Sequence, residues 1–204
     1  VISSIIGTYA VSVWPTGDDA FKAMDYSYDL SSVISTVSFF LLAHFYVRDL
    51  RVFFVTAMGI LLAVAFNKYT AYFTHTSHAP VREIARSSRT GSATTLLTGL
   101  AVGYESSVWA ILIIALAIFG SVVVFASAGA TSVLYGVALV GIGMLSHTGN
   151  NVSMDAFGPI ADNAGGIGEL AGMDPGPRRI LADLDAAGNT TKAITKGIAI
   201  ASAV

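Results

Sequence analysis

The sequence predicts an all-α fold, a polytopic bundle of transmembrane helices. Hydrophobic residues make up 54% of its 204 residues and charged residues only 12%, whereas soluble proteins carry about 25% charged residues. The stretch from Ser106 to Met154 contains no Asp, Glu, Lys or Arg and is long enough for two spans of about 20 residues each. Such runs are too continuous for barrel strands, which alternate every second residue. Helices are therefore expected, because lipid forces the backbone to satisfy its own hydrogen bonds.

The composition also excludes several other classes of protein. The chain has no cysteine, which rules out disulfides and thiolate metal sites. Its net charge of −2 gives no basic footprint, so no nucleic-acid partner is expected. The N-terminal residues lack the charged region of a signal peptide, and both ends of the chain lie within apolar runs. We therefore expect residues 1–204 to be a fragment of a longer protein and to form a single transmembrane domain.

The first half of the chain predicts three full spans after a partial one. Residues 1–13 correspond to the end of a span, and the polar connection at 14–29 has turn chemistry at Pro15 and Gly17. The next spans are expected at about 30–47, 52–73 and 96–124.

The second half predicts one long span and the start of another, giving about five to six spans in all. The fifth span begins near Thr131, after a turn at 127–129, and continues toward Leu170. The segment 172–179 contains two prolines and interrupts it, so the last helix is expected to begin after Pro177.

Arginines in the connections predict the orientation in the membrane. The polar segment 74–95 carries three arginines, and 174–180 on the same side carries two, against two in the turn at 48–51 on the other side. The excess of positive charge places the first side in the cytoplasm. The arginines counted are Arg82, Arg86, Arg89, Arg178 and Arg179 on that side, and Arg48 and Arg51 opposite.

Two polar stripes stand out in the last two helices. Asp155, Asp162 and Glu169 are spaced i, i+7, i+14, which places them on one face of a helix. The following helix has a similar stripe at i, i+4, i+7 and i+11, formed by Asp185, Asn189, Lys192 and Lys196. We expect the stripes to face each other across a short turn, with glycine and alanine allowing close packing.

These stripes predict a site for cations and anions near the cytoplasmic end of the bundle. Carboxylates without His or Cys favour hard cations such as Mg²⁺ or Ca²⁺, and Mg²⁺ often binds through carboxylates plus phosphate oxygens. The seam is interpreted as half of a metal–phosphate site or as part of an ion path. A single Lys or Asp near a span end commonly just snorkels to the interface, but a clustered set indicates a function.

Histidines and asparagines give weaker signals. His75 and His78 are expected in a solvated loop rather than at a metal. His147, Asn150 and Asn151 are unusual at membrane depth and are expected to face the bundle interior.

Long motifs in the second half resemble a known family. The segments "DAFGPIADNAGGIGELAGMD" and "LDAAGNTTKAITKGIAIASA", with the earlier "PVREIARSSRTGSATTLLTGLAVGYES", strongly resemble the membrane-bound ion-translocating pyrophosphatases. The resemblance is continuous from about Tyr69 to Val204 and collinear before that. It implies a homodimer of about sixteen helices per chain that couples pyrophosphate hydrolysis to H⁺ or Na⁺ pumping. This chain would run from the end of helix seven to the start of helix twelve of that fold.

The resemblance implies a metal and substrate site. Asp162 falls on the family's Mg²⁺–pyrophosphate aspartate, and Asn189 falls on its metal- and substrate-binding asparagine. Asp155 and Asp185 are expected to have structural roles or to hold the metal-binding residues in place. No catalytic residue is assigned within the fragment, because the family's water-orienting aspartates lie on helices outside it.

The resemblance also implies the type of pump. Potassium-dependent members have Ala at the position of Lys192, whereas potassium-independent members have Lys there and Thr three residues on, as Thr195 is here. Lys192, Thr195 and Lys196 are therefore expected at a substrate and cation site in which an ammonium replaces K⁺. The expected whole is a proton-pumping inorganic diphosphatase with Mg²⁺ as cofactor in a prokaryotic inner membrane, and the fragment alone is expected to be inactive. The alternative is a segment of a non-enzymatic ion transporter or channel.

Overall fold

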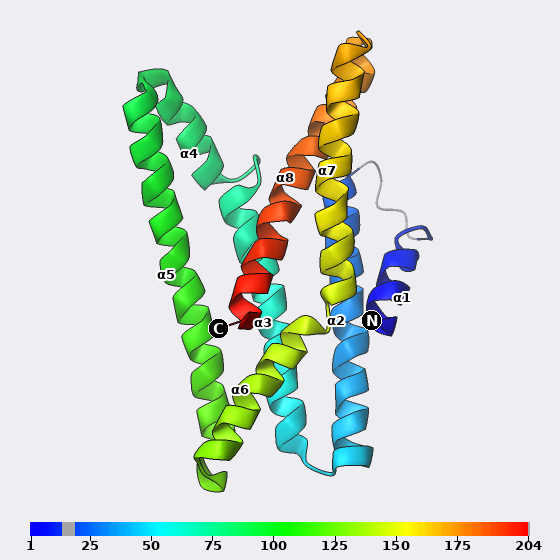
Figure 1. Ribbon diagram of the computed structural model, residues 1–204, viewed down its shortest axis with the longest axis vertical. Helices are drawn as coiled ribbons and strands as arrows, with labels where there is room; N and C mark the ends of the chain where they lie inside the picture. The colour runs from blue at the N-terminus through cyan, green and yellow to red at the C-terminus, as the bar shows by residue number, and fades with distance from the viewer. Residues whose placement is uncertain (14–18, 204) are drawn as a thin grey trace.

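The computed structural model describes residues 1–13 and 19–203 and contains only helices and connections among them. The all-α prediction is confirmed. Figure 1 shows long helices running between two ends of a bundle, with the shorter α1 at one side and the shorter α4 between α5 and α3 at the upper end. The α-helices are α1 (Ile2–Ala10), α2 (Ala20–Leu41), α3 (Leu50–Thr74), α4 (Ala79–Ser87), α5 (Ser92–Phe125), α6 (Ala130–Leu145), α7 (Thr148–Leu170) and α8 (Pro175–Ala203).

Length and hydropathy identify the membrane-spanning helices. Three described helical stretches are long and apolar enough to cross a membrane, at Ala20–Val47, Leu50–Thr90 and Ser92–Ala128. The bent pair formed by α6 and α7 gives a fourth. The expected number of five to six is higher because it also counted the ends of the chain, where α1 has only nine residues. The polar stripe of α8 lowers the hydropathy of the other end.

The second helix begins well before the predicted span. Residues 20–29 were expected to be a polar connection, but α2 starts at Ala20, where the Asp19 carboxylate accepts a 3.0 Å hydrogen bond from the Lys22 amide. The polar first turns of α2 form ion pairs with α3, because Lys68 Nζ lies 3.4 Å from the carboxylates of both Asp25 and Asp29. The expected turn at Pro15 and Gly17 lies outside the described residues.

The predicted continuous fifth span is wrong, because the structure breaks it into α6 and α7 with a bend of 48°. His147 lies at the break and is fully buried. Ser32 Oγ donates to the Tyr28 carbonyl at 2.8 Å, so it accepts from His147 Nε2 at 2.7 Å. His147 Nδ1 then accepts from Ser146 Oγ at 3.1 Å. Polar partners on α2 therefore hold the bend, together with the Tyr28 ring stacked on the imidazole at 4.4 Å.

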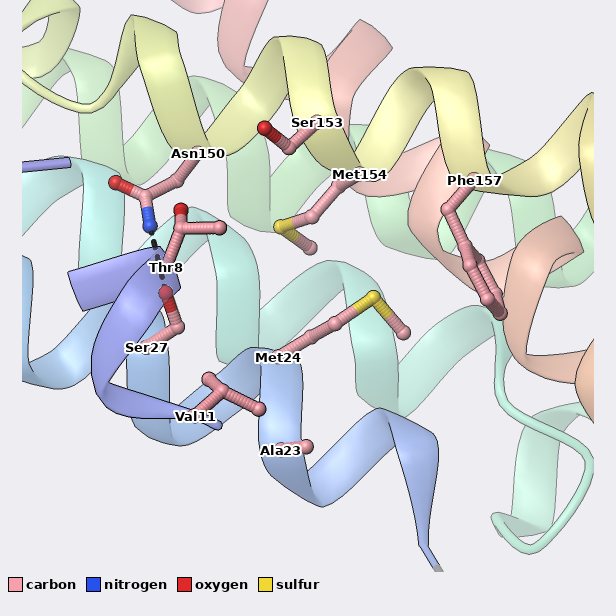
Figure 2. A pocket seen from close by; sticks show the side chains of 9 residues that line it. All are labelled: Thr8, Val11, Ala23, Met24, Ser27, Asn150, Ser153, Met154 and Phe157. Carbon is pink, nitrogen blue, oxygen red and sulfur yellow. Dashed lines mark hydrogen bonds between the residues drawn. The ribbon is translucent and has the colours of Figure 1, made fainter. Parts of the chain in front are cut away.

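Asn150 continues this buried polar contact one turn further. Its Nδ2 donates to Ser27 Oγ at 3.0 Å, above a cavity of about 200 Å³ between α1, α2 and α7 (Figure 2). Met24 and Met154 extend into that cavity from the two facing helices. The expectation that His147 and Asn150 face the interior is confirmed, whereas Asn151 is only half-buried.

Two connections differ from the expected ones in detail. The polar segment between α3 and α5 contains the short helix α4, with Pro80 in its first turn, where a missing amide costs nothing. The helix α8 begins at Pro175, three residues earlier than expected, because Pro175 and Pro177 both fall in its first turn, where amides have no partner within the helix. The turn between α5 and α6 lies where it was predicted, with Gly129 at a φ of +88°.

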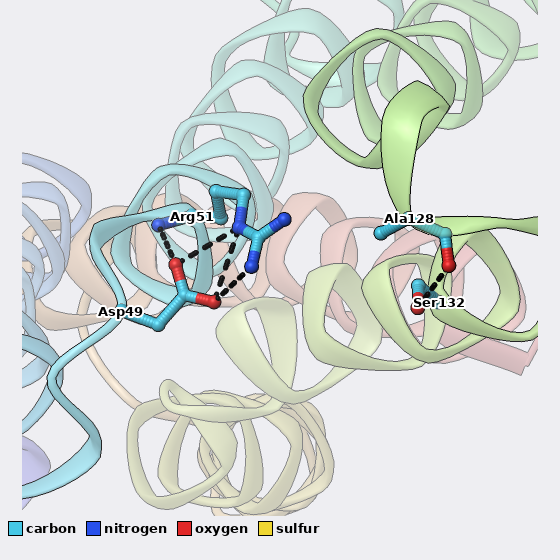
Figure 3. A network of polar contacts seen from close by, with 4 residues as sticks. All are labelled: Asp49, Arg51, Ala128 and Ser132. Carbon is cyan, nitrogen blue, oxygen red and sulfur yellow. Dashed lines mark hydrogen bonds and ion pairs between the residues drawn. The ribbon is translucent and has the colours of Figure 1, made fainter.

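At the end of the bundle opposite the α7–α8 turn, an ion pair joins Asp49 and Arg51 at the start of α3 (Figure 3). Asp49 caps α3 and accepts from the Arg51 amide at 2.9 Å and from its guanidinium at 2.8 Å. Hydrogen bonding from Arg51 keeps the pKa of the Asp49 carboxyl below its usual range. The same guanidinium lies 5.4 Å from the centre of the Phe125 ring, which ties the start of α3 to the end of α5. In the adjoining turn, Ser132 Oγ donates to the Ala128 carbonyl.

Candidate functional site

Glycines set the distance between α7 and α8, which pack along each other beside α3. A Cβ placed on Gly188 would lie 2.9 Å from the Gly158 Cα, so neither helix tolerates a side chain at this crossing. Thr191 Oγ1 also lies 3.2 Å from the Met154 carbonyl oxygen across the interface and 2.9 Å from the Gly188 carbonyl oxygen of its own helix. Close backbone approach of this kind stabilises helix pairs in lipid, where apolar burial contributes little. The pair is therefore held in a fixed antiparallel register.

This register brings one carboxylate of α7 to α8. Thr195 Oγ1 donates to Asp155 Oδ1 over 3.0 Å, and Thr195 is 8% exposed. Both residues line a cavity of about 320 Å³ together with the exposed Lys196. A hydroxyl, a carboxylate and an ammonium thus share one small concave surface.

A row of polar side chains continues along α8. Asn189 Nδ2 lies 3.3 Å from Asp185 Oδ2, and Lys192 Nζ lies 3.5 Å from Asn189 Oδ1. The amide is therefore oriented, with its donor toward the carboxylate and its oxygen toward the ammonium. Asp185 Oδ1 is buried without a hydrogen-bond partner among the described residues. That oxygen and the second lone pair of the Asn189 oxygen are available to a cation or a donor.

The stem of Lys192 crosses the glycine seam. A Cβ placed on Gly158 would lie 2.5 Å from Lys192 Cε, so the lysine stem lies over the space that the missing side chain leaves. Neither Lys192 nor Lys196 forms an ion pair with a carboxylate in residues 1–13 and 19–203. The stem of Lys192 is held against Gly158, and its ammonium has no carboxylate partner among the described residues. Lys192 therefore places a positive charge beside Asn189.

Only part of the carboxylate stripe of α7 contacts the polar stripe of α8. The register that joins Asp155 to Thr195, and Gly168 to Leu181, places Asp162 level with the turn of α8 between Asp185 and Asn189. Asp162 is exposed, with no hydrogen bond recorded within the described part of the chain.

The expectation that the two stripes face each other directly is therefore wrong. Small residues occupy the seam, and the polar rows flank it. Glu169 lies in the last turn of α7, 3.5 Å from Arg178 in the first turn of α8.

The side-chain oxygens near α7 and α8 determine which metal ion could bind here. In the described ranges no group of three or more His, Cys, Asp or Glu side chains is placed to hold a metal ion. The oxygens available are those of Asp162, Asp185 and Asn189, all hard ligands of the kind Mg²⁺ prefers. The orphaned Asp185 Oδ1 fits a hard cation, but these ligands need others, from substrate oxygens or from another part of the protein.

The sequence did not indicate the glycine pair. Gly158 and Gly188 decide how α7 and α8 pack, yet they lie among many small residues that look alike in sequence. The only available signal was the recurrence of small residues at helical spacing opposite the polar stripe. Thr191 was also missed, because a threonine that bonds to a neighbouring backbone resembles any other helical threonine.

The fold and the site together define a class. The chain is a multi-pass integral membrane segment whose last two helices carry carboxylate, amide and ammonium groups, a pattern that marks ion or substrate paths. The chain belongs to the family described as inorganic H⁺ pyrophosphatase, whose family model matches residues 1–204.

Relatives with assigned names support this membership. The chain is 49% identical to the "K(+)-insensitive pyrophosphate-energized proton pump" of Chloroflexus aurantiacus over 100% of its own length. It is 51% identical to a pump of the same name from Streptomyces avermitilis over 72% of its length. A "putative K(+)-stimulated pyrophosphate-energized sodium pump" of Clostridium tetani is 40% identical over the whole chain. The chain spans 28%, 18% and 30% of these relatives.

These comparisons confirm the family resemblance and the multi-pass membrane location, and the family implies the use of a divalent metal. Overall identity does not separate proton pumps from sodium pumps, since a "K(+)-insensitive pyrophosphate-energized proton pump" of Methanosarcina mazei is 39% identical to the chain and the putative sodium pump of Clostridium tetani is 40% identical. Individual residues must make that distinction.

Proposed function

We propose that this segment is part of a membrane pump that couples hydrolysis of magnesium pyrophosphate to proton translocation, independently of potassium. The observation that carries the proposal is the position of Lys192, whose ammonium lies 3.5 Å from the Asn189 oxygen while its stem crosses Gly158. Family membership and the names of the relatives support the reaction. The polar row on α8 is where the substrate would bind.

Magnesium is the proposed cofactor. Asp162 and Asn189 would hold it, and it would neutralise negative charge on the phosphate oxygens. Asp155 and Asp185 would act by positioning. Asp155 fixes Thr195, and Asp185 orients the Asn189 amide so that its oxygen faces the site. A water molecule attacks one phosphorus, the bridging P–O bond breaks, and two phosphates leave. The residues that orient this water are assigned to helices outside the segment.

Lys192 would supply the positive charge that potassium-dependent pumps take from K⁺. A lysine ammonium is a compact charge on a flexible stem, and the stem here is held against a glycine. Thr195 and Lys196 would complete the cation and substrate site on the side of the Asp155 cavity. The tethered charge makes a bound potassium ion unnecessary.

The place of the segment in the whole protein is also a proposal. It would comprise the end of helix seven to the start of helix twelve, with α7 and α8 in the ring that lines the substrate funnel. The pump would be a homodimer in a prokaryotic inner membrane, and the segment alone would be inactive.

The test uses the full-length protein in membranes. Hydrolysis of pyrophosphate should require Mg²⁺ and proceed without K⁺, with choline chloride as the control for ionic strength. Lys192→Ala should make activity depend on K⁺. Activity of Lys192→Ala that ignores K⁺ would contradict the role of Lys192. Ion transport without any pyrophosphate hydrolysis would instead favour a non-enzymatic transporter.

A further inference from the structure

Glycines hold α6 against α3 in the same way as they hold α7 against α8. A Cβ placed on Gly59 of α3 would lie 2.9 Å from the Gly143 Cα of α6, and one on Gly143 would lie 3.0 Å from the Gly59 Cα. The matching approach of α7 to α8 is that of Gly158 and Gly188. Backbones this close cannot shift without clashing, because packed interiors are nearly incompressible. The two halves of the bent pair α6–α7 therefore belong to two different tightly packed pairs, α3–α6 and α7–α8.

The two pairs meet mainly where α8 packs on α3, and this contact is looser. A Cβ placed on Gly197 of α8 would lie 3.4 Å from Thr70 Oγ1 of α3, which is an ordinary van der Waals distance. Thr190 Oγ1 lies 3.5 Å from the Thr74 carbonyl oxygen of α3, but only 3.3 Å from a carbonyl oxygen of its own helix. Side chains rather than backbones meet here, so α8 can slide along α3 by a small shear movement.

The turn between α6 and α7 is fixed to α1 and α2. Ser4 Oγ of α1 donates to the Ser146 carbonyl at 3.3 Å, and a Cβ placed on Gly149 would lie 2.6 Å from the Ser4 Cβ. On the other side, Ser32 of α2 accepts from His147 Nε2 at 2.7 Å. The bend of 48° thus lies at a point that neighbouring helices hold in place, as a pivot requires.

Beyond this pivot, the first turns of α7 border cavities on two faces. One face lines the cavity of about 200 Å³ shared with α1 and α2 (Figure 2). The other face, about 200° around the helix, lines the cavity of about 320 Å³ shared with α8. The α7 residues concerned are Asn150, Ser153, Met154 and Phe157 on the first face, and Thr148, Asn151, Val152 and Asp155 on the second. Packed interiors contain few voids larger than a water molecule, so these turns can tilt without compressing a dense core.

We propose that α7 and α8 tilt as one unit about the turn at Ser146 and His147, with α8 sliding along α3, and that the hydrogen bond between His147 and Ser32 holds the present orientation. The polar row of α8 and Asp162 of α7 then move together, so the site keeps its internal geometry while it shifts relative to α3 and α6. The hinge follows from the packing, whereas its coupling to pyrophosphate also rests on the proposed function.

The experiment measures distances between pairs of spin labels in the full-length protein in nanodiscs, by pulsed electron paramagnetic resonance. The exposed Leu134 of α6 and Leu170 of α7 report across the bend, Leu134 and Leu61 report within the α3–α6 pair, and Leu170 and Ile200 report within the α7–α8 pair. From the pivot to Leu170 is about 33 Å, so a tilt of about 5° moves this label by about 3 Å. Magnesium imidodiphosphate, which is not hydrolysed, should shift the distance across the bend and leave the other two unchanged.

A pair of variants tests the hinge without any ligand. Ser32→Ala removes the acceptor of His147, so the distribution of distances across the bend should broaden or shift by about 3 Å for a tilt of about 5°. The matched control is Ser153→Ala, which removes a hydroxyl from the same region of the bundle that bonds only to the Gly149 carbonyl of its own helix. This control should keep the wild-type distribution.

Three outcomes would overturn the proposal. An unchanged distribution in Ser32→Ala, or an equal change in Ser153→Ala, would remove the role of the hydrogen bond at the bend. A change between Leu170 and Ile200 would show that α7 and α8 do not move as one unit. Bound imidodiphosphate that leaves the distance across the bend unchanged would remove the coupling. Binding of imidodiphosphate is measured separately by calorimetry, so its absence would count against the proposed function, while the Ser32→Ala result still decides on the hinge.

Discussion

The Thr195 hydroxyl donates a 3.0 Å hydrogen bond to the Asp155 carboxylate and joins α8 to α7 beside Lys196. Thr195 is buried, whereas Asp155 is exposed where both residues line the cavity. The contact holds the side of the site on which Lys196 lies, one turn of helix beyond Lys192. This bond adds a side-chain contact to the glycine packing that sets the position of α8 relative to α7.

Replacing Thr195 should therefore weaken both stability and cation selectivity. Thr195→Val keeps the shape but leaves a carboxylate oxygen without its donor, at a cost of about 1–3 kcal/mol. We expect a lower melting temperature in detergent and partial stimulation of pyrophosphatase activity by K⁺. Thr195→Ser keeps the hydroxyl and should behave as the wild type. A Thr195→Val protein with unchanged melting and no response to K⁺ would show that the bond has no influence on the site.

The polar contacts at the α6–α7 break should stabilise the bend. His147→Ala removes a ring that donates to Ser32, accepts from Ser146 and stacks on Tyr28, so the Ser146 hydroxyl loses its acceptor and the buried Ser32 oxygen loses its donor. We expect a loss of about 1–3 kcal/mol in unfolding free energy for the unsatisfied groups, measured as a shift in thermal unfolding. His78→Ala, on the connection between α3 and α4, is the control and should change little. An equal shift in both would contradict a special role for the break.

Some of this architecture could be predicted from the sequence and some could not. The spans were visible because their apolar runs are long and uncharged, and the stripe of Asp185, Asn189 and Lys192 was visible because helical spacing is fixed. The bend at His147 was missed because the residues that hold it belong to α2, far away in the sequence. The expectation that the two polar stripes face each other was wrong because close packing at glycines, rather than attraction between charges, determines which faces of α7 and α8 meet.

The cap of α3 should respond to pH. Arg51 lowers the pKa of Asp49, so the ionised carboxylate stabilises the folded state above the unfolded pKa. This contribution is lost as the pH falls through the lower, folded pKa, and it does not change above neutrality. The protection factors of the amides at 50–53 in hydrogen exchange, which correct for the intrinsic slowing of exchange at low pH, should therefore fall on acidification. Asp49→Asn caps without a charge and should show no such dependence; the same fall in that variant would assign the effect to another group.

Asp162 provides the sharpest test of the metal site. If it holds Mg²⁺ on pyrophosphate, Asp162→Ala in the full-length protein should lower kcat by at least about 100-fold, with the protein still folded. The control is Asp174→Ala, an exposed carboxylate in the α7–α8 turn, which should keep its activity. Structural packing alone predicts unchanged activity for both variants. An active Asp162→Ala enzyme would remove Asp162 from the site.

Gly158 tests the link between packing and the position of Lys192. A methyl group there would lie 2.5 Å from Lys192 Cε and 3.0 Å from the Gly188 carbonyl oxygen, so Gly158→Ala must push the lysine stem aside or separate the helices. We expect at least about a ten-fold fall in pyrophosphatase activity, because a displacement of about 1 Å in such a site is costly. Gly165→Ala makes the same change on α7 where no atom lies within 4 Å of the added group. Near-wild-type activity in Gly165→Ala with loss in Gly158→Ala would support the proposal, and equal activity of the two would show that Lys192 does not depend on the glycine seam.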